Sequence, residues 1–242
     1  MKVFCSILMT IATLSSCAKK QSDTTTLTPN MSNKDIIAGH ILNYLALGDS
    51  YTIGEAVPAD QSFPYQLAHE LNRQKQTVNT PTIIATTGWT TDELIDAISQ
   101  SGIADKKFDF VTLLIGVNDQ YRGLSQDNYK IKFEQVLNTA IHFVNGDKNH
   151  VFVLSIPDYG VTPFGKENEA AIGVQIDQFN AINKQISTAA GVNYLDITTI
   201  SRQAANNPGL IASDGLHPSG KMYLKWVEQL YPIVVQRLQS NK

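Results

Sequence analysis

The 242-residue sequence lacks several features that point to particular classes of protein. Its two cysteines, Cys5 and Cys17, both lie near the N-terminus, so the body of the chain has no disulfide and no thiolate metal site. We find no metal-ligand spacing and no glycine-rich phosphate loop before a helix. Basic stretches are also missing, and 19 Lys and Arg against 22 Asp and Glu give a net charge of −3. The sequence therefore predicts no metal, no cofactor and no nucleic-acid partner.

The apolar run of residues 3–14 is too short to span a bilayer, but it follows Lys2 and has the length of a signal-peptide core. The next residues, Leu14-Ser15-Ser16-Cys17, resemble the lipobox of bacterial lipoproteins, in which cleavage precedes a cysteine that carries lipid. We therefore expect a signal peptide at 1–16 and a lipid anchor at Cys17, which would hold the protein on a membrane of the bacterial cell envelope. The alternative is an ordinary secretory signal with an incidental cysteine.

The residues after Cys17 are polar, rich in Ser and Thr, and without helical or strand periodicity. Such a segment is typical of a flexible tether. The predicted organisation is thus a lipidated N-terminus and tether over 17–40, followed by one domain over 41–242.

Short apolar runs alternate with amphipathic stretches along this domain. Nearly continuous apolar runs indicate strands that are covered on both faces of a parallel sheet. Because parallel strands need crossover connections, the alternation predicts an α/β fold, a three-layer α/β/α sandwich with a five-stranded parallel sheet. The expected strands are 44–47, 82–86, 110–115, 151–156 and 192–197. One helix is expected to begin near Pro64, and others to cover 91–100, 126–144 and 169–190. A last helix is expected from about Ser219, and Pro232 would kink or end it.

Chemically useful residues follow the predicted strands. Ser50 comes after the first strand, Gly88 after the second and Asn118 after the third, while Asp214 and His217 lie beyond the fifth. Ligands of such sheets bind outside the carboxyl ends of the strands, so these residues are expected at one edge.

Together these groups are the parts of an acyl-transfer site. A serine needs an adjacent base, usually histidine, and the histidine needs a carboxylate that fixes its tautomer. The three-position spacing of Asp214 and His217 lets both side chains face the same way in a turn. Backbone N–H groups and amides are suitable donors to the oxyanion of a tetrahedral intermediate.

Four blocks in order carry a resemblance to the SGNH hydrolases, also called GDSL esterases/lipases: "GDSYTIG", "TTGWTTDEL", "IGVNDQ" and "SDGLHP". The resemblance implies the strand order 2-1-3-4-5 and a catalytic triad of Ser50, Asp214 and His217. It also implies an oxyanion hole made by the N–H groups of Ser50 and Gly88 and the side-chain amide of Asn118. Tyr51 stands where the family name has leucine, at a position without a chemical role.

Simpler interpretations exist for individual residues. Ser50 taken alone is more typical of a helix N-cap than of a nucleophile, and Gly88 is also typical of a turn with positive φ. Asp49 and Asp119 are interpreted as structural, with Asp119 bonding to backbone near the site. Three further residues, Asp158, Tyr159 and Phe164, either line the acyl or alcohol pocket or pack within their loop.

The sequence thus predicts a serine ester hydrolase that cleaves carboxylic esters through an acyl-enzyme, with short-chain or carbohydrate O-acyl esters as substrates. A lysophospholipase or thioesterase that acts on long acyl chains is the alternative within this class. A surface lipoprotein that binds a ligand without turnover is the alternative outside it. The residues do not predict the oligomeric state.

Overall fold

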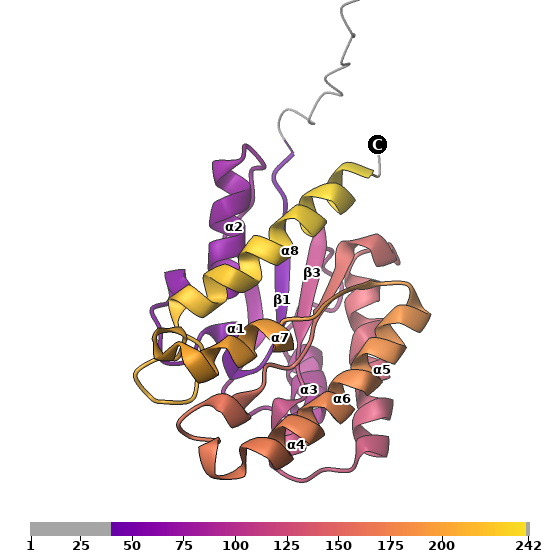
Figure 1. Ribbon diagram of the computed structural model, residues 1–242. Helices are drawn as coiled ribbons and strands as arrows, with labels where there is room; N and C mark the ends of the chain where they lie inside the picture. Colours follow the sequence, from indigo (N-terminus) through magenta and orange to yellow (C-terminus); the bar gives the residue numbers. More distant parts are fainter. Residues whose placement is uncertain (1–39, 241–242) are drawn as a thin grey trace, which may run out of the picture. The chain divides into compact units, whose positions relative to one another are not determined.

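The computed structural model describes residues 40–240, which contain a five-stranded parallel sheet with the order β2-β1-β3-β4-β5 (Figure 1). The predicted strands and their order are confirmed. The predicted signal peptide, Cys17 and most of the predicted tether lie outside the described residues. The strands are β1 (Tyr44–Gly48), β2 (Thr82–Ala85), β3 (Phe110–Leu114), β4 (Val151–Leu154) and β5 (Asn193–Leu195).

Each predicted helix is present, and short helices fill several of the loops. The long helices are α2 (Phe63–Arg73), α3 (Thr91–Gln100), α5 (Gln126–Phe143), α6 (Glu169–Ala190) and α8 (Gly220–Ser240). The short ones are α1 (Ser50–Ile53), α4 (Val117–Tyr121) and α7 (Thr198–Ser201). None of the helices in this part of the chain is long and apolar enough to cross a membrane.

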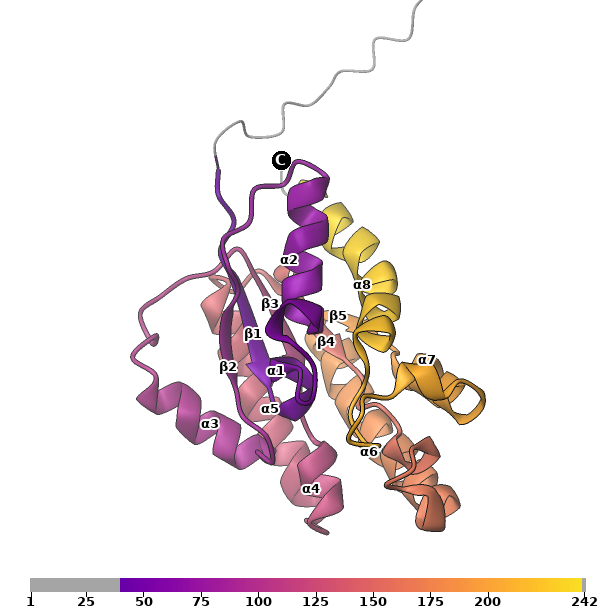
Figure 2. The ribbon, with the colours of Figure 1, turned by 90° about the vertical axis from the view of Figure 1, so that its left-hand side faces the viewer.

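The helices form a layer on each face of the sheet (Figure 2). Helices α2 and α8 pack against each other on one face, and α3, α5 and α6 lie side by side on the other. Every residue of β1, β3 and β4 is buried, which explains their continuous apolar sequences. Complete burial of a side chain such as Leu45 or Phe110 contributes about 1.5–3 kcal/mol.

Helix α8 continues past Pro232 to Ser240, so the proline does not end it. Proline costs a helix one hydrogen bond and introduces a steric clash. The buried side chains of Trp226, Leu230 and Val234 lie on both sides of Pro232, and their packing in the core keeps the helix on the sheet.

Candidate active site

Five separate segments of the chain line one pocket of about 180 Å³, and four of them carry predicted catalytic residues. Ser50 is the first residue of α1, two positions after the last residue of β1, and Asn118 is the second residue of α4, after β3. Gly88 lies in the turn that follows β2, and His217 lies in the loop before α8. All four line the pocket. Helices α1 and α4 lie beyond the same end of the sheet, the carboxyl ends of its strands (Figures 1 and 2).

Ser50 is presented by a sharp turn between strand and helix. The N-cap of α1 is Asp49, whose buried carboxyl oxygen Oδ1 accepts the Tyr51 N–H at 3.0 Å, so the alternative of Ser50 as a cap is wrong. The turn requires glycine at position 48, because a Cβ there would lie 2.1 Å from Thr52 Oγ1 and 2.4 Å from the Leu114 carbonyl oxygen. The backbone of Gly48 thus packs closely against both α1 and the end of β3, and the turn that follows it places Ser50 at the pocket wall.

His217 is held by Asp214 through two contacts. Its Nδ1 lies 2.6 Å from Asp214 Oδ2, and its backbone N–H donates to Asp214 Oδ1 at 3.0 Å. Burial would raise the pKa of Asp214, but hydrogen bonds from the His217 ring and from the N–H groups of Leu216 and His217 outweigh it and lower the pKa below 3.8. The carboxylate therefore stays ionised and fixes the tautomer with the proton on Nδ1, which leaves Nε2 free to accept a proton. Tyr51 packs edge-on against the imidazole, with ring centroids 5.7 Å apart.

The opposite wall carries hydrogen-bond donors. Gly88 has φ +86°, the left-handed region that glycine tolerates, and no residue in the range 40–240 accepts its N–H. The side chain of Asn118 donates through Nδ2 to the Trp89 carbonyl oxygen at 2.9 Å. This bond uses one of the two amide hydrogens and fixes the orientation of the other.

Two buried carboxyl groups lie behind this wall, next in sequence to Ser50 and Asn118. Asp119 Oδ2 accepts from the N–H and the hydroxyl of Thr91, as expected for a residue that bonds to backbone near the site. Burial raises the pKa of Asp119 to about 6. Burial, and to a smaller extent the charge of Asp119, raises the pKa of Asp49 to about 8 although the Tyr51 N–H opposes this. Both groups support the loops rather than line the pocket.

Three aromatic side chains line the pocket: Tyr159 is buried, whereas Tyr121 and Phe164 are exposed and form its mouth. The rings of Tyr121, Tyr159 and Phe164 contact one another with centroids 6.1–6.3 Å apart. Tyr159 and Phe164 thus line the pocket, whereas Asp158 does not: it bonds to Arg202 Nε at 2.9 Å. Sequence reasoning missed Tyr121, although its position three residues after Asn118 places it one turn further along the same helix.

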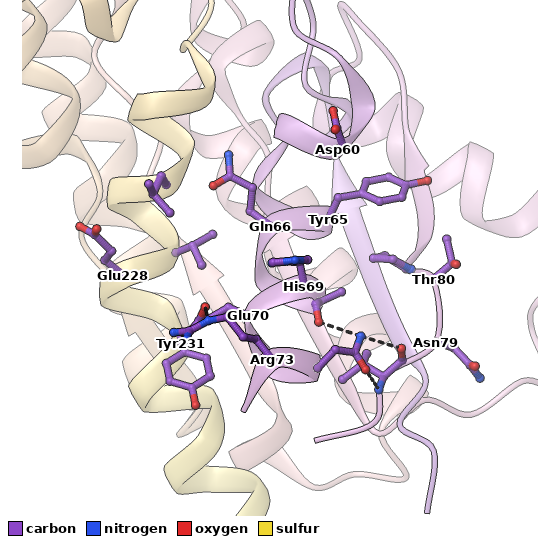
Figure 3. Close-up of a pocket in the computed structure, with 16 residues that line it drawn as sticks. Asp60, Tyr65, Gln66, His69, Glu70, Arg73, Asn79, Thr80, Glu228 and Tyr231 are labelled. Atoms are coloured by element: carbon purple, nitrogen blue, oxygen red, sulfur yellow. Dashed lines mark hydrogen bonds and ion pairs between the residues drawn. The ribbon is translucent and has the colours of Figure 1, made fainter. Parts of the chain in front are cut away.

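A larger hollow of about 800 Å³ lies along α2 and α8 (Figure 3). Its polar groups include His69 and the ion pair of Glu70 with Arg73 on α2, and Glu228 on α8. It reaches residues 78–81, which lead into the amino end of β2, so it lies away from the edge where Ser50 and His217 meet. Because Ser50 and His217 line the smaller pocket and not this hollow, the smaller pocket is the candidate active site.

Within the described residues no three His, Cys, Asp or Glu side chains lie close enough together to hold a metal ion.

Comparison with known proteins identifies the family of this chain. Residues 46–225 match the GDSL-like Lipase/Acylhydrolase family. The match covers most of the chain, so the protein belongs to this family of carboxylic ester hydrolases.

Solved structures share the fold at low sequence identity. A member of the lipolytic G-D-S-L family from Veillonella parvula DSM 2008 has a TM-score of 0.67 and 14% identity, over 81% of this chain and 100% of that one. Axe2, an acetylxylan esterase from Geobacillus stearothermophilus, has a TM-score of 0.61 and 18% identity, over 82% and 94%. The secreted effector protein SseJ of Salmonella typhimurium is 36% identical over 61 residues, which span 25% of this chain and only 15% of SseJ.

Proposed function

We propose that this protein hydrolyses short-chain carboxylic esters, including O-acyl esters of carbohydrates, with Ser50 as nucleophile. The observation that supports the proposal best is the small pocket lined by Ser50, Gly88, Asn118 and His217. Its volume of about 180 Å³ is below the roughly 300–1,000 Å³ of drug-sized ligand sites, which favours a small acyl group. The acetylxylan esterase Axe2 has the same fold and an ester substrate of this type.

In the proposed reaction, Ser50 Oγ attacks the ester carbonyl carbon while its proton moves to His217 Nε2. The oxyanion accepts hydrogen bonds from the N–H groups of Ser50 and Gly88 and from Asn118 Nδ2. The carbon–oxygen bond to the alcohol then breaks, and the alcohol leaves with the proton from His217. Water attacks the acyl-enzyme and gives its proton to His217, which returns it to Ser50 Oγ as the acid is released.

The direct test compares aryl esters of increasing acyl length. We expect the highest kcat/KM with acetate or butyrate and loss of turnover in Ser50→Ala. A fluorophosphonate should label the wild-type protein covalently and leave Ser50→Ala unlabelled. A folded wild-type protein that is inert to this reagent and to all simple esters would instead support ligand binding without turnover.

A long-chain lysophospholipase or thioesterase is favoured by one feature, the exposed aromatic mouth. The side chains of Tyr121 and Phe164 are 59% and 53% exposed, so they extend an apolar surface beyond the small pocket. An optimum at octanoate or palmitate would select this alternative.

We further propose that Cys17 carries a lipid and anchors the protein in the bacterial cell envelope. The support is the lipobox-like sequence Leu14-Ser15-Ser16-Cys17. Metabolic labelling with a fatty acid should mark the full chain, and Cys17→Ala should abolish the label. Labelling that survives this substitution would contradict the anchor.

A further inference from the structure

Arg122 connects the two segments that carry the proposed oxyanion donors. It follows the last residue of α4, and its backbone N–H donates to the Asn118 carbonyl oxygen at 3.0 Å. Its guanidinium donates through Nη2 to the Gly88 carbonyl oxygen at 2.5 Å and through Nη1 to Glu93 Oε1 at 3.0 Å. The side chain therefore bridges α4, the turn after β2 and the start of α3.

The turn at Gly88 depends on these contacts. The carbonyl oxygen of Trp89 is held by Asn118, and the preceding carbonyl oxygen, that of Gly88, is held by Arg122. On the other side, the hydroxyl of Thr87 donates to the Glu55 carboxylate. Gly88 has a positive φ, and glycine has more conformational freedom than any other residue. The direction of the Gly88 N–H therefore depends on the contacts that hold the neighbouring peptide groups.

Glu93 keeps the guanidinium in place from behind. Its Oε2 accepts the Thr90 N–H at 2.7 Å, and the Thr90 hydroxyl oxygen accepts the Glu93 N–H, which is the capping box of α3. The carboxylate is thus fixed to the helix before it meets Arg122. An arginine bonded at both ends of its planar fork is well oriented even though half of its side chain is exposed.

We propose that Arg122 is a positioning residue that aligns the Gly88 N–H with the oxyanion of the transition state. The inference rests on the proposed esterase activity. Arg122 does not line the pocket, so it acts through Gly88 rather than on the substrate. An interaction that improves only the transition state changes kcat and leaves KM nearly unchanged.

The test compares Arg122→Ala with Arg73→Ala in the full chain, using an aryl acetate. Arg73 is a matched control because it forms an exposed ion pair with Glu70 on α2, away from the site. Removing a whole oxyanion donor costs about 10²–10³-fold in kcat, so misaligning one is expected to cost about 10- to 100-fold. KM should change by less than about threefold. A fluorophosphonate places its phosphoryl oxygen in the oxyanion position, so the rate of inactivation by this reagent should fall by about the same factor as kcat. Arg73→Ala should match the wild type in kcat, KM and inactivation rate.

Arg122→Lys provides the second variant and is the one used if Arg122→Ala does not fold. Lysine keeps the charge but cannot span Gly88 and Glu93 as a planar fork, so its kcat should remain at least about fivefold below wild type. Wild-type kcat in Arg122→Lys would overturn the positioning role, as would wild-type kcat in a folded Arg122→Ala. Absence of Ser50-dependent turnover in the wild type would overturn the proposed function itself, which is a separate result.

Discussion

The two sides of the pocket are built in different ways. The base side consists of one short loop, in which Asp214 reaches His217 three residues later through the ring and the backbone. The donor side combines Ser50, Gly88 and Asn118 from three separate strand ends and is held by contacts between distant segments. The base side is therefore a local device, whereas the donor side exists only when the sheet and its loops are assembled.

Asp214→Asn is expected to have the largest effect on the base side, because an amide cannot hold His217 in the tautomer that leaves Nε2 free. In a serine protease triad the equivalent change lowers kcat about 10⁴-fold, and we expect a loss of about 10³–10⁴-fold here. Steady-state kinetics on an aryl acetate provides the measurement, with the exposed Asp96→Asn as control. A loss of less than tenfold would show that Asp214 does not orient the base.

Asn118→Ala addresses the donor side and should lower kcat by about 10²–10³-fold, since it removes one oxyanion donor. The same substitution frees the Trp89 carbonyl oxygen, so the Gly88 turn also loses a contact. Asn138, exposed on α5, gives the matched control Asn138→Ala. Equal kcat in Asn118→Ala and Asn138→Ala would exclude Asn118 from the oxyanion hole.

The carboxyl groups of the two sides should respond to pH in opposite directions. Asp49 has a folded pKa of about 8 against an ordinary value of 3.8, so between these pH values the unfolded chain has released a proton that the folded protein keeps. Its contribution to stability is complete below about pH 4 and is lost as the pH rises towards 8. Asp214, with a lowered pKa, stabilises the fold above its unfolded pKa and loses this contribution on acidification.

Chemical denaturation across this pH range measures the difference. We expect Asp49→Asn to remove a decline in unfolding free energy of up to about 1.4 kcal/mol per pH unit, the value for one proton. Asp105→Asn, at an exposed position, should leave the slope as it is. An unchanged slope in Asp49→Asn would mean that Asp49 is ionised in the folded protein.

The same contrast explains what could be predicted from the sequence. The strands were evident because β1, β3 and β4 are buried on both faces and therefore continuously apolar. The pairing of Asp214 with His217 was evident because it is local in sequence. The fold places each strand end at a common edge, which made the grouping of Ser50, Gly88 and Asn118 predictable as well.

Contacts that depend on side-chain direction were not predictable. Asp49, rather than Ser50, caps α1, because the turn after Gly48 brings the carboxyl group of Asp49 to the Tyr51 N–H. Tyr51 contacts His217 although its position was expected to have no role. Arg122 carries no motif, and its bridge to Gly88 and Glu93 joins residues about thirty positions apart.

Phe164→Ala is expected to have the smallest effect, at the point where the two sides meet. The Phe164 N–H donates to the Gly215 carbonyl oxygen at 3.0 Å in the base loop, while its ring contacts Tyr121 of α4 on the donor side. Removing the ring opens the mouth without touching a proposed catalytic group. Because Phe164 is 53% exposed, stability should change by less than about 0.5 kcal/mol.

Under the proposed short-chain specificity the Phe164 ring limits the acyl group, so the added room should favour longer acyl groups by about the contribution of one methylene, 0.8 kcal/mol, and the kcat/KM ratio of octanoate to acetate should rise about fourfold. Under the long-chain alternative the ring is an apolar contact for the chain, and the same ratio should fall. Ile131→Ala, at an exposed apolar position on α5, is the control. A ratio that stays unchanged in Phe164→Ala would place the acyl group deeper in the pocket, near Val117. The aromatic mouth would then contact only the alcohol, and a series of acetates with alcohols of increasing size should show the change in specificity instead.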